Sequence, residues 1–293
     1  NYGAVFSTYP KYRARSGQVE DIYKRVNDCF ERSLNGEALD NNSPEMQAIK
    51  AYIEFIGKDV PKGEKPKGSG IFVLPFLDRA IDPVQGAKIY AAKCQSCHQA
   101  NGQGILAADS VEYLYPPLWG ANSYNMGAGL FRMSRFAGYV KYNMPQGVNF
   151  PESQLTDEEA WDLAAFVNSQ QRPSMDISSD WPKIKEKPVD HPFGPYADQF
   201  SEKQHKYGPF KPIAAEKKKQ APKEGRKIFR PYFGPIWTKI FRPYGETAKS
   251  IGAKNLSPLW ISPYTGEKKF AHTGHPFLKF NHNPQIHPSS RQV

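Results

Sequence analysis

Three side chains able to bind a metal cofactor stand together in the run Cys94-Gln95-Ser96-Cys97-His98. Two cysteines three residues apart, followed at once by histidine, form the pattern that attaches haem c. The cysteines would add as thioethers across the haem vinyl groups, and His98 would bind the iron as its proximal ligand. A redox-active cysteine pair or half of a zinc site are the alternatives. With only three cysteines, the sequence has no second pair to complete a zinc site.

An electron-transfer haem needs a sixth iron ligand, and Met144 is the candidate. It lies 46 residues after His98, in the run Asn143-Met144-Pro145, which would present the thioether on a turn. A neutral sulfur ligand favours ferrous iron and raises the reduction potential. Packing in a core is the alternative role for this methionine. Other possible ligands are Met126, Met133 and Lys141.

The third cysteine, Cys29, forms a second candidate site. On a helix, Arg25 and Cys29 would share one face with Arg32 or Ser33, at intervals of three or four residues. Two guanidinium groups would favour the thiolate and could bind a small dianion. Such a thiolate could ligate a metal or attack sulfur. The alternative is a buried free cysteine beside surface arginines.

Helices must position both sites. Apolar residues recur every three or four positions over 19–34, which predicts a helix that carries Cys29. A second helix is expected to end at Gly57, because Ser43 can cap its start and Pro44 suits the first helical position. A polar stretch rich in proline and glycine follows and predicts a linker over 58–80.

The cysteine–histidine motif is expected to follow a helix that starts at Asp82-Pro83. Residues 99–129, rich in Gly, Asn, Pro and Tyr, would wrap the haem as a loop. A short helix would end at Asn143, and a last one would open on a capping box at Thr156–Glu159. This order of elements over 81–173 is typical of a class I cytochrome c domain, so the expected fold class is all-α.

The remaining residues, 174–293, differ in composition. Sixteen of the 26 prolines lie from Pro173 onward, and a six-residue sequence, Lys-Ile-Phe-Arg-Pro-Tyr, occurs at both 227–232 and 239–244. Regular periodicity is absent, but aromatic residues persist, which argues against simple disorder. An extended arm that lies on a surface, its own or a partner's, is therefore expected.

Charge is distributed unevenly along the chain. Residues 201–293 contain 18 Lys and Arg against 5 Glu, a net charge of +13, whereas the first 200 residues contain 21 basic and 24 acidic residues. Such asymmetry is typical of an interaction arm, here toward a redox partner protein or respiratory complex. Nucleic acid is disfavoured as the partner, because haem c is attached outside the bacterial cytoplasm or in the mitochondrial intermembrane space. No apolar run reaches the length of about 18 residues that predicts a transmembrane helix.

Several longer motifs are specific when taken together. In the first part they are Tyr9-Pro10-Lys11-Tyr12-Arg13, the run Arg25–Gly36 and Ser43–Met46; in the haem domain they are Pro116–Gly120, Ser123–Asn125, Asn143–Pro145 and Ala160–Asp162. Over about residues 1–173 the chain resembles the thiosulfate dehydrogenase family, dihaem enzymes with two cytochrome c-like domains. The resemblance implies that 1–57 is a partial or degenerate cytochrome c-like domain ahead of the 58–80 linker, the 81–173 haem domain and the 174–293 arm.

The resemblance also implies roles for the candidate residues. A cysteine at the position of Cys29 is the distal ligand of the family's catalytic haem, and residues matching Arg25 and Ser33 line the thiosulfate site. Two thiosulfates are joined into tetrathionate there. Two electrons then leave through a second haem, which corresponds here to the one expected at Cys94, Cys97, His98 and Met144.

One family feature is missing from the sequence. In the family, the catalytic haem has its own Cys-x-x-Cys-His motif, before the stretch that matches Asn1. The motif at Cys94–His98 is the only one in this sequence, so the motif of the catalytic haem is missing. Either a missing N-terminus supplies a second haem near Cys29, or the first domain has lost its haem. In the second case the protein would be an electron-transfer or structural subunit without thiosulfate-oxidising activity. Six histidines follow the haem domain, and one could replace a lost ligand: His191, His205, His272, His275, His282 and His287.

The expected compartment follows from the haem motif. Covalent attachment of haem c implies a periplasmic or other extracytoplasmic location, with the mitochondrial intermembrane space as the alternative. An unpaired Cys29 in such an oxidising compartment needs a function or protection from oxidation.

Overall fold

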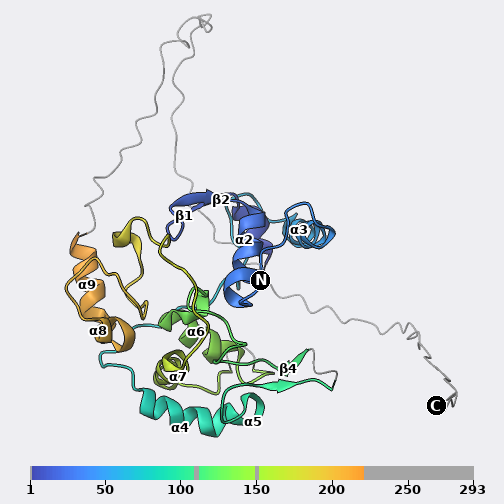
Figure 1. The fold of residues 1–293 in the computed structure, drawn as a ribbon. Coiled ribbons are helices and arrows are strands. Elements are labelled where there is room, and N and C mark those ends of the chain that lie inside the picture. The colour runs from blue at the N-terminus through green and yellow to red at the C-terminus, as the bar shows by residue number, and fades with distance from the viewer. Residues whose placement is uncertain (1, 109–111, 149–151, 221–293) are drawn as a thin grey trace, which may run out of the picture. The chain divides into compact units, whose positions relative to one another are not determined.

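The computed structural model describes residues 2–108, 112–148 and 152–220 (Figure 1). They belong to the first of the two units into which the chain divides, Asn1–Arg226. Helices make up most of their regular structure, beside two antiparallel pairs of short strands, so the helical fold class is confirmed. Within the described ranges, no helix has the length and apolar character needed to cross a membrane.

The N-terminal region, residues 2–57, surrounds a small core. Val26, Met46 and Ile53 are its buried apolar side chains. Gly57 lets the last turn of one helix approach another, because a Cβ there would lie 2.6 Å from Cβ of Phe6. The elements of this region are α1 (Gly3–Thr8), β1 (Lys11–Arg13), β2 (Gln18–Glu20), α2 (Ile22–Asp28), the π-helical turn η1 (Cys29–Ser33) and α3 (Pro44–Gly57).

The helix predicted over 19–34 is shorter and is divided in two. Residues 18–20 pair with β1 as strand β2, and Asp21 caps α2 by accepting a 2.9 Å hydrogen bond from the amide of Lys24. From Cys29 the helix widens, because the amide of Leu34 donates to the carbonyl of Cys29 at 3.0 Å, five residues back. Apolar periodicity found the helix but could not show this change of winding.

Helix α3 matches its prediction. It begins at Pro44, and the Ser43 hydroxyl accepts a 3.2 Å hydrogen bond from the amide of Met46. It ends at Gly57, as expected, and no helix or strand follows until Pro83. The second half of the predicted linker is nevertheless packed, because Leu74 is buried and the carbonyl of Pro75 accepts a hydrogen bond from a tryptophan of the next domain.

The CxxCH domain, residues 81–173, follows the predicted order of helices. Asp82 caps its first helix, and Thr156 and Glu159 form the predicted capping box. The strand pair was not predicted, because its two short strands lie in a stretch rich in turn residues. The elements are α4 (Pro83–Lys93), α5 (Gln95–His98), β3 (Ile105–Leu106), β4 (Tyr113–Tyr115), the 3-10 turn η2 (Gly129–Phe131), α6 (Met133–Asn143) and α7 (Asp157–Ser169).

Helices α4 and α7 cross at close range and form the frame of this domain. A Cβ at Gly86 would lie 2.0 Å from the carbonyl oxygen of Asp162, so the crossing requires glycine there. Tyr90 and Phe166 pack beside it with ring centroids 5.4 Å apart. Trp161 on α7 is fully buried in a cluster that also contains much of α6.

Residues 174–220 are more ordered than the arm predicted from their proline content. They contain the 3-10 turn η3 (Ile184–Glu186), α8 (Glu202–Tyr207) and α9 (Phe210–Gln220). Phe210 is buried in the core of the CxxCH domain, with its ring centroid 5.5 Å from that of Trp161. The apolar residues of this stretch therefore extend the domain. The rest of the predicted arm, with both copies of the repeat, lies outside the described residues.

Candidate functional site

The cysteine–histidine motif begins where α4 ends. Cys94 is the C-cap of α4, and its amide still donates to the carbonyl of Tyr90 at 2.9 Å. The next four residues form the single turn α5, in which the amide of His98 donates to the carbonyl of Cys94 at 3.0 Å. One helical turn thus carries both cysteines and the histidine.

The ring of His98 is oriented by the main chain. Its Nδ1 atom lies 2.8 Å from the carbonyl oxygen of Pro116, and the residue is only 8% exposed. Because a carbonyl can only accept, Nδ1 carries the proton in this contact. The lone pair of Nε2 is then left for a metal, which is the arrangement that second-shell partners impose on metal-binding histidines.

The loop after His98 folds back closely on the motif. A Cβ at Gly102 would lie 2.2 Å from the ring of Trp119, and one at Gly104 would lie 2.0 Å from the carbonyl oxygen of Tyr115. Both glycines have positive φ, which other residues adopt with strain. These close approaches bring the Pro116 segment beside His98.

Met144 lies at the end of α6, as predicted. It is the C-cap, its amide donates to the carbonyl of Val140 at 3.0 Å, and its side chain is partly buried against the core of the domain. Two of the three competing side chains, those of Met133 and Lys141, have other contacts. The Met133 sulfur is fully buried 3.9 Å from Nδ2 of Asn168, and Lys141 forms an ion pair with Asp157.

These residues fit haem c better than either alternative. Among the described residues, no group of three or more His, Cys, Asp or Glu side chains could hold a metal ion, so Cys94 and Cys97 lack zinc partners there. Burial raises the pKa of the Cys94 thiol to about 11, whereas the attacking cysteine of a redox pair needs a lowered pKa. An oriented His98 and a closely wrapped loop suit a ligand of the iron instead.

Cys29 lies in a different setting, at the junction of α2 and η1. Nη1 of Arg25 donates to its sulfur at 2.8 Å. Burial disfavours the charged guanidinium, but Cys29 and its hydrogen bond outweigh this and raise the pKa of Arg25. Both residues line a cavity of about 230 Å³ whose other walls are largely apolar and come from α1, α2, η1 and α3. The cavity could take a flat apolar group with a cation and a sulfur at its edge.

The structure separates Arg32 and Ser33 from this pair. Arg32 is buried, and its guanidinium donates to both carboxylate oxygens of Asp180, at 2.7 and 2.8 Å. Ser33 is exposed, and neither residue is among those that line the cavity beside Cys29. The expected shared face assumed an α-helix throughout, whereas a π-helical turn begins at Cys29 and Arg32 pairs with Asp180.

Sequence reasoning missed the polar contacts that hold η1. Asp28, the residue before Cys29, forms ion pairs with Arg15, Lys24 and Arg32. Burial alone would raise the pKa of Asp28, but these three cations hold it below its ordinary value. No local pattern could reveal Asp180, which is 148 residues from Arg32 in sequence.

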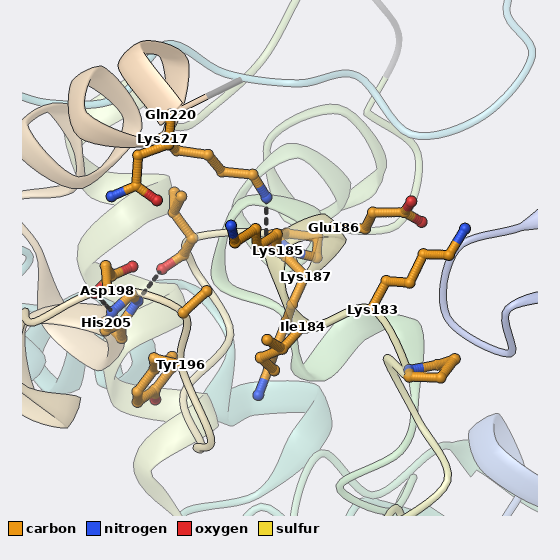
Figure 2. A pocket seen from close by; sticks show the side chains of 14 residues that line it. Lys183, Ile184, Lys185, Glu186, Lys187, Tyr196, Asp198, His205, Lys217 and Gln220 are labelled. Carbon is orange, nitrogen blue, oxygen red and sulfur yellow. Dashed lines mark hydrogen bonds and ion pairs between the residues drawn. The ribbon is translucent and has the colours of Figure 1, made fainter. Parts of the chain in front are cut away.

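A second cavity, of about 610 Å³, is formed by residues 182–220 (Figure 2). Some of its polar groups contact one another: Nζ of Lys217 donates to the carbonyl of Lys187 at 2.5 Å, and both ring nitrogens of His205 contact oxygens, of Val189 and Asp198. Apart from His205, none of the residues singled out for haem or thiosulfate lies in its wall. His205 is thus committed to local contacts, and four of the six later histidines lie outside the described residues.

Comparison with known protein families gives two matches. Residues 2–61 match the SoxA/TsdA cytochrome c domain, and residues 83–171 match cytochrome c. The first match covers Cys29 and the second covers the CxxCH motif and Met144. Neither reaches Asp180.

Individual relatives agree with both matches. A thiosulfate dehydrogenase of Allochromatium vinosum is 44% identical over 169 residues, 58% of this chain and 61% of that protein. One of Psychrobacter arcticus is 41% identical over 179 residues, 60% of this chain and 53% of that protein. The solved thiosulfate dehydrogenase TsdBA of Marichromatium purpuratum superposes with a TM-score of 0.55 at 32% identity, over 64% of this chain and 38% of that one.

The chain spans little more than half the length of these curated relatives. Within that span the chain has two parts. One contains the CxxCH turn, the oriented His98 and Met144 at the end of α6, and the other contains Cys29 and matches the SoxA/TsdA model. The chain therefore resembles thiosulfate dehydrogenases and other c-type cytochromes, with a match to the SoxA/TsdA cytochrome c domain ahead of a match to cytochrome c.

Proposed function

We propose that the protein transfers electrons through one haem c bound by Cys94, Cys97, His98 and Met144. The main support for this proposal is the 2.8 Å contact between Nδ1 of His98 and the Pro116 carbonyl. This contact places the proton on Nδ1 and leaves the lone pair of Nε2 for iron. The bound haem supplies a one-electron couple whose potential a thioether ligand raises. The chain's own part is to fix the histidine, hold the methionine at the C-cap of α6 and limit access of water.

We further propose that thiosulfate is oxidised beside Cys29. Arg25 supports this, because its guanidinium touches the Cys29 sulfur and can also attract a small dianion. In the overall reaction two thiosulfate dianions form one sulfur–sulfur bond and release two electrons, giving tetrathionate. A one-electron carrier at His98 would accept these electrons in two steps.

A second haem beside Cys29 is part of this proposal. An open cavity of about 230 Å³ with apolar walls lies next to the Cys29 sulfur and could receive one edge of that haem. Its attachment cysteines would have to come from outside these 293 residues, since Cys94 and Cys97 are the only other cysteines. The proposal also includes an extracytoplasmic, in bacteria periplasmic, location. The partner contact predicted for the basic arm falls largely on residues 221–293, outside the structure's described range.

Native mass spectrometry and a thiosulfate assay test these proposals together. The intact protein from its natural source should carry two haems, and added thiosulfate should reduce its haem without oxygen and yield tetrathionate. One haem, with no reduction by thiosulfate but normal reduction by dithionite, would contradict the enzyme. That result would favour an electron-transfer or structural subunit instead.

A further inference from the structure

We propose that Arg32, Asp180 and Asn125 are positioning residues for Cys29, because together they fix the π-helical turn η1 on which the cysteine stands. This deepens the proposed function, since it rests on Cys29 being the reactive group. Its test nevertheless observes the turn itself and needs neither thiosulfate nor a second haem.

The turn η1 depends on contacts from outside. A π-helical turn is rare and is found mostly at functional sites, as a local departure from the more favourable α-helix. The carbonyls of Glu31 and Arg32 lie in its last residues, where a helix leaves carbonyl groups without helical partners. Both carbonyls therefore need donors that the helix does not supply.

Asn125 supplies both donors. Its side-chain Nδ2 donates to the carbonyl of Glu31 at 2.8 Å, and its backbone amide donates to the carbonyl of Arg32 at 3.2 Å. Asn125 is itself held, because it is only 2% exposed and its Oδ1 accepts a 3.0 Å hydrogen bond from the amide of Gly127. Its neighbour Tyr124 is buried in the core of the CxxCH domain. The end of η1 is thus docked on that domain.

Arg32 and Asp180 form the second attachment. The two hydrogen bonds between them are parallel and bidentate, and both side chains are at least nine-tenths buried. Nη1 of Arg32 also donates to the carbonyl of Gly127 at 3.3 Å. Removing Asp180 would take this bidentate partner from the buried Arg32, which would keep its 3.5 Å ion pair with Asp28, and breaking a buried ion pair is strongly destabilising.

These attachments act on Cys29 through the short turn. Cys29 is the first residue of η1 and Arg32 the fourth, so the two share one turn of backbone. Arg25 belongs to α2, and its 2.8 Å contact with the Cys29 sulfur spans the junction between the two kinds of helix. If Arg32 lost its contacts, the turn could move, and the hydrogen bond between Arg25 and the Cys29 sulfur would therefore change.

Hydrogen exchange of the full chain with its haem tests this directly. The amides of Leu34 and Gly36, which donate to Cys29 and Phe30 at 3.0 and 2.9 Å, report on the turn. In Asp180→Asn, a peptide covering 29–36 should exchange about tenfold faster, because local opening no longer breaks an intact buried ion pair. Peptides of α7 should exchange as in the wild type. Arg32→Lys keeps the positive charge but cannot form the two parallel hydrogen bonds to Asp180. Its exchange rate over 29–36 should therefore lie between those of the wild type and Asp180→Asn.

The thiol itself gives a second readout. Once haem is attached, Cys94 and Cys97 are thioethers, so a thiol reagent reports on Cys29 alone. Asp180→Asn should react several-fold faster than the wild type, in step with the faster exchange.

Asp162→Asn is the matched control. It disturbs another bidentate pair, Arg79–Asp162, whose hydrogen bonds measure 2.8 and 2.9 Å and which joins the end of the 58–80 stretch to α7. This variant should leave exchange over 29–36 and the rate of the Cys29 thiol unchanged, even if it lowers global stability. Unchanged exchange and thiol rate in Asp180→Asn, or equal changes in the control, would overturn the proposal.

Discussion

The two cysteine-bearing regions are stabilised in different ways. The CxxCH domain has a continuous buried apolar cluster that takes in α4, α6, α7 and the start of α9. The N-terminal region buries only Val26, Met46 and Ile53 in its own core, and η1 relies on polar contacts with Asn125 and Asp180.

This difference suggests a division of roles. Stabilisation from burial grows with the apolar area removed from water, so a large core can hold a haem ligand in place without help. A region with a small core is only marginally stable alone. We therefore expect the surroundings of Cys29 to open locally while the CxxCH domain stays folded, which would suit a site that admits a substrate.

The largest expected effect is on the free energy of unfolding, when a side chain is removed from the larger core. Trp161→Ala removes a fully buried ring that packs on Phe76 and Phe210 and donates to the carbonyl of Pro75. It should lower the free energy of unfolding by about 3–5 kcal/mol, measured by urea titration. Phe55→Ala, at an aromatic side chain that is 65% exposed in the N-terminal region, should change it by less than about 0.5 kcal/mol. A loss in Trp161→Ala as small as that in Phe55→Ala would contradict the role of the buried Trp161 ring in the larger core.

The next effect is on the reduction potential of the haem, which should respond to a change in the CxxCH domain but not to one at η1. Met144→Ala removes the proposed thioether ligand and should lower the reduction potential of the haem by on the order of 0.1 V, a fraction of the range that axial ligands span. A redox titration followed by absorbance measures it. Asp180→Asn, which acts on η1, should leave this potential unchanged. A Met144→Ala potential equal to the wild-type value would show that the ligand is another residue.

A smaller effect concerns the segment that carries Asp180. Burial lowers the pKa of Lys187 to about 8, from about 10.5 in the unfolded chain. Between these values the unfolded state binds more protons than the folded state, so this lysine makes stability rise with pH there. Lys187→Met should remove that part of the rise between about pH 8 and 10. Urea titrations at several pH values measure this dependence, with Lys185→Met, at an exposed lysine, as the control. An equal rise of the free energy of unfolding with pH in the wild type and both variants would refute the prediction.

Much of the CxxCH domain could be predicted because its signals are local. Asp82 and Thr156 cap helices within their own first turns, and the spacing of Cys94, Cys97 and His98 is itself the haem motif. The role of Pro116 could not be predicted, since its carbonyl reaches His98 only through the fold of the intervening loop.

The Cys29 region was harder to predict because its contacts are distant in sequence. Spacing along an ideal helix brought Arg25 and Cys29 together correctly. The same spacing misplaced Arg32, because its preferred partner, Asp180, lies in a proline-rich segment expected to be an arm. Buried Phe210 shows why that segment is ordered, since a few apolar residues suffice to hold it on the domain.

The central claim is that electrons from thiosulfate enter at Cys29 and leave through the haem at His98. Anaerobic reduction of that haem by thiosulfate, compared in the wild-type holoprotein and in Cys29→Ala, tests it most directly. We predict that Cys29→Ala loses reduction by thiosulfate while dithionite still reduces its haem fully, with an unchanged spectrum. Reduction by thiosulfate at the wild-type rate in Cys29→Ala would contradict the claim.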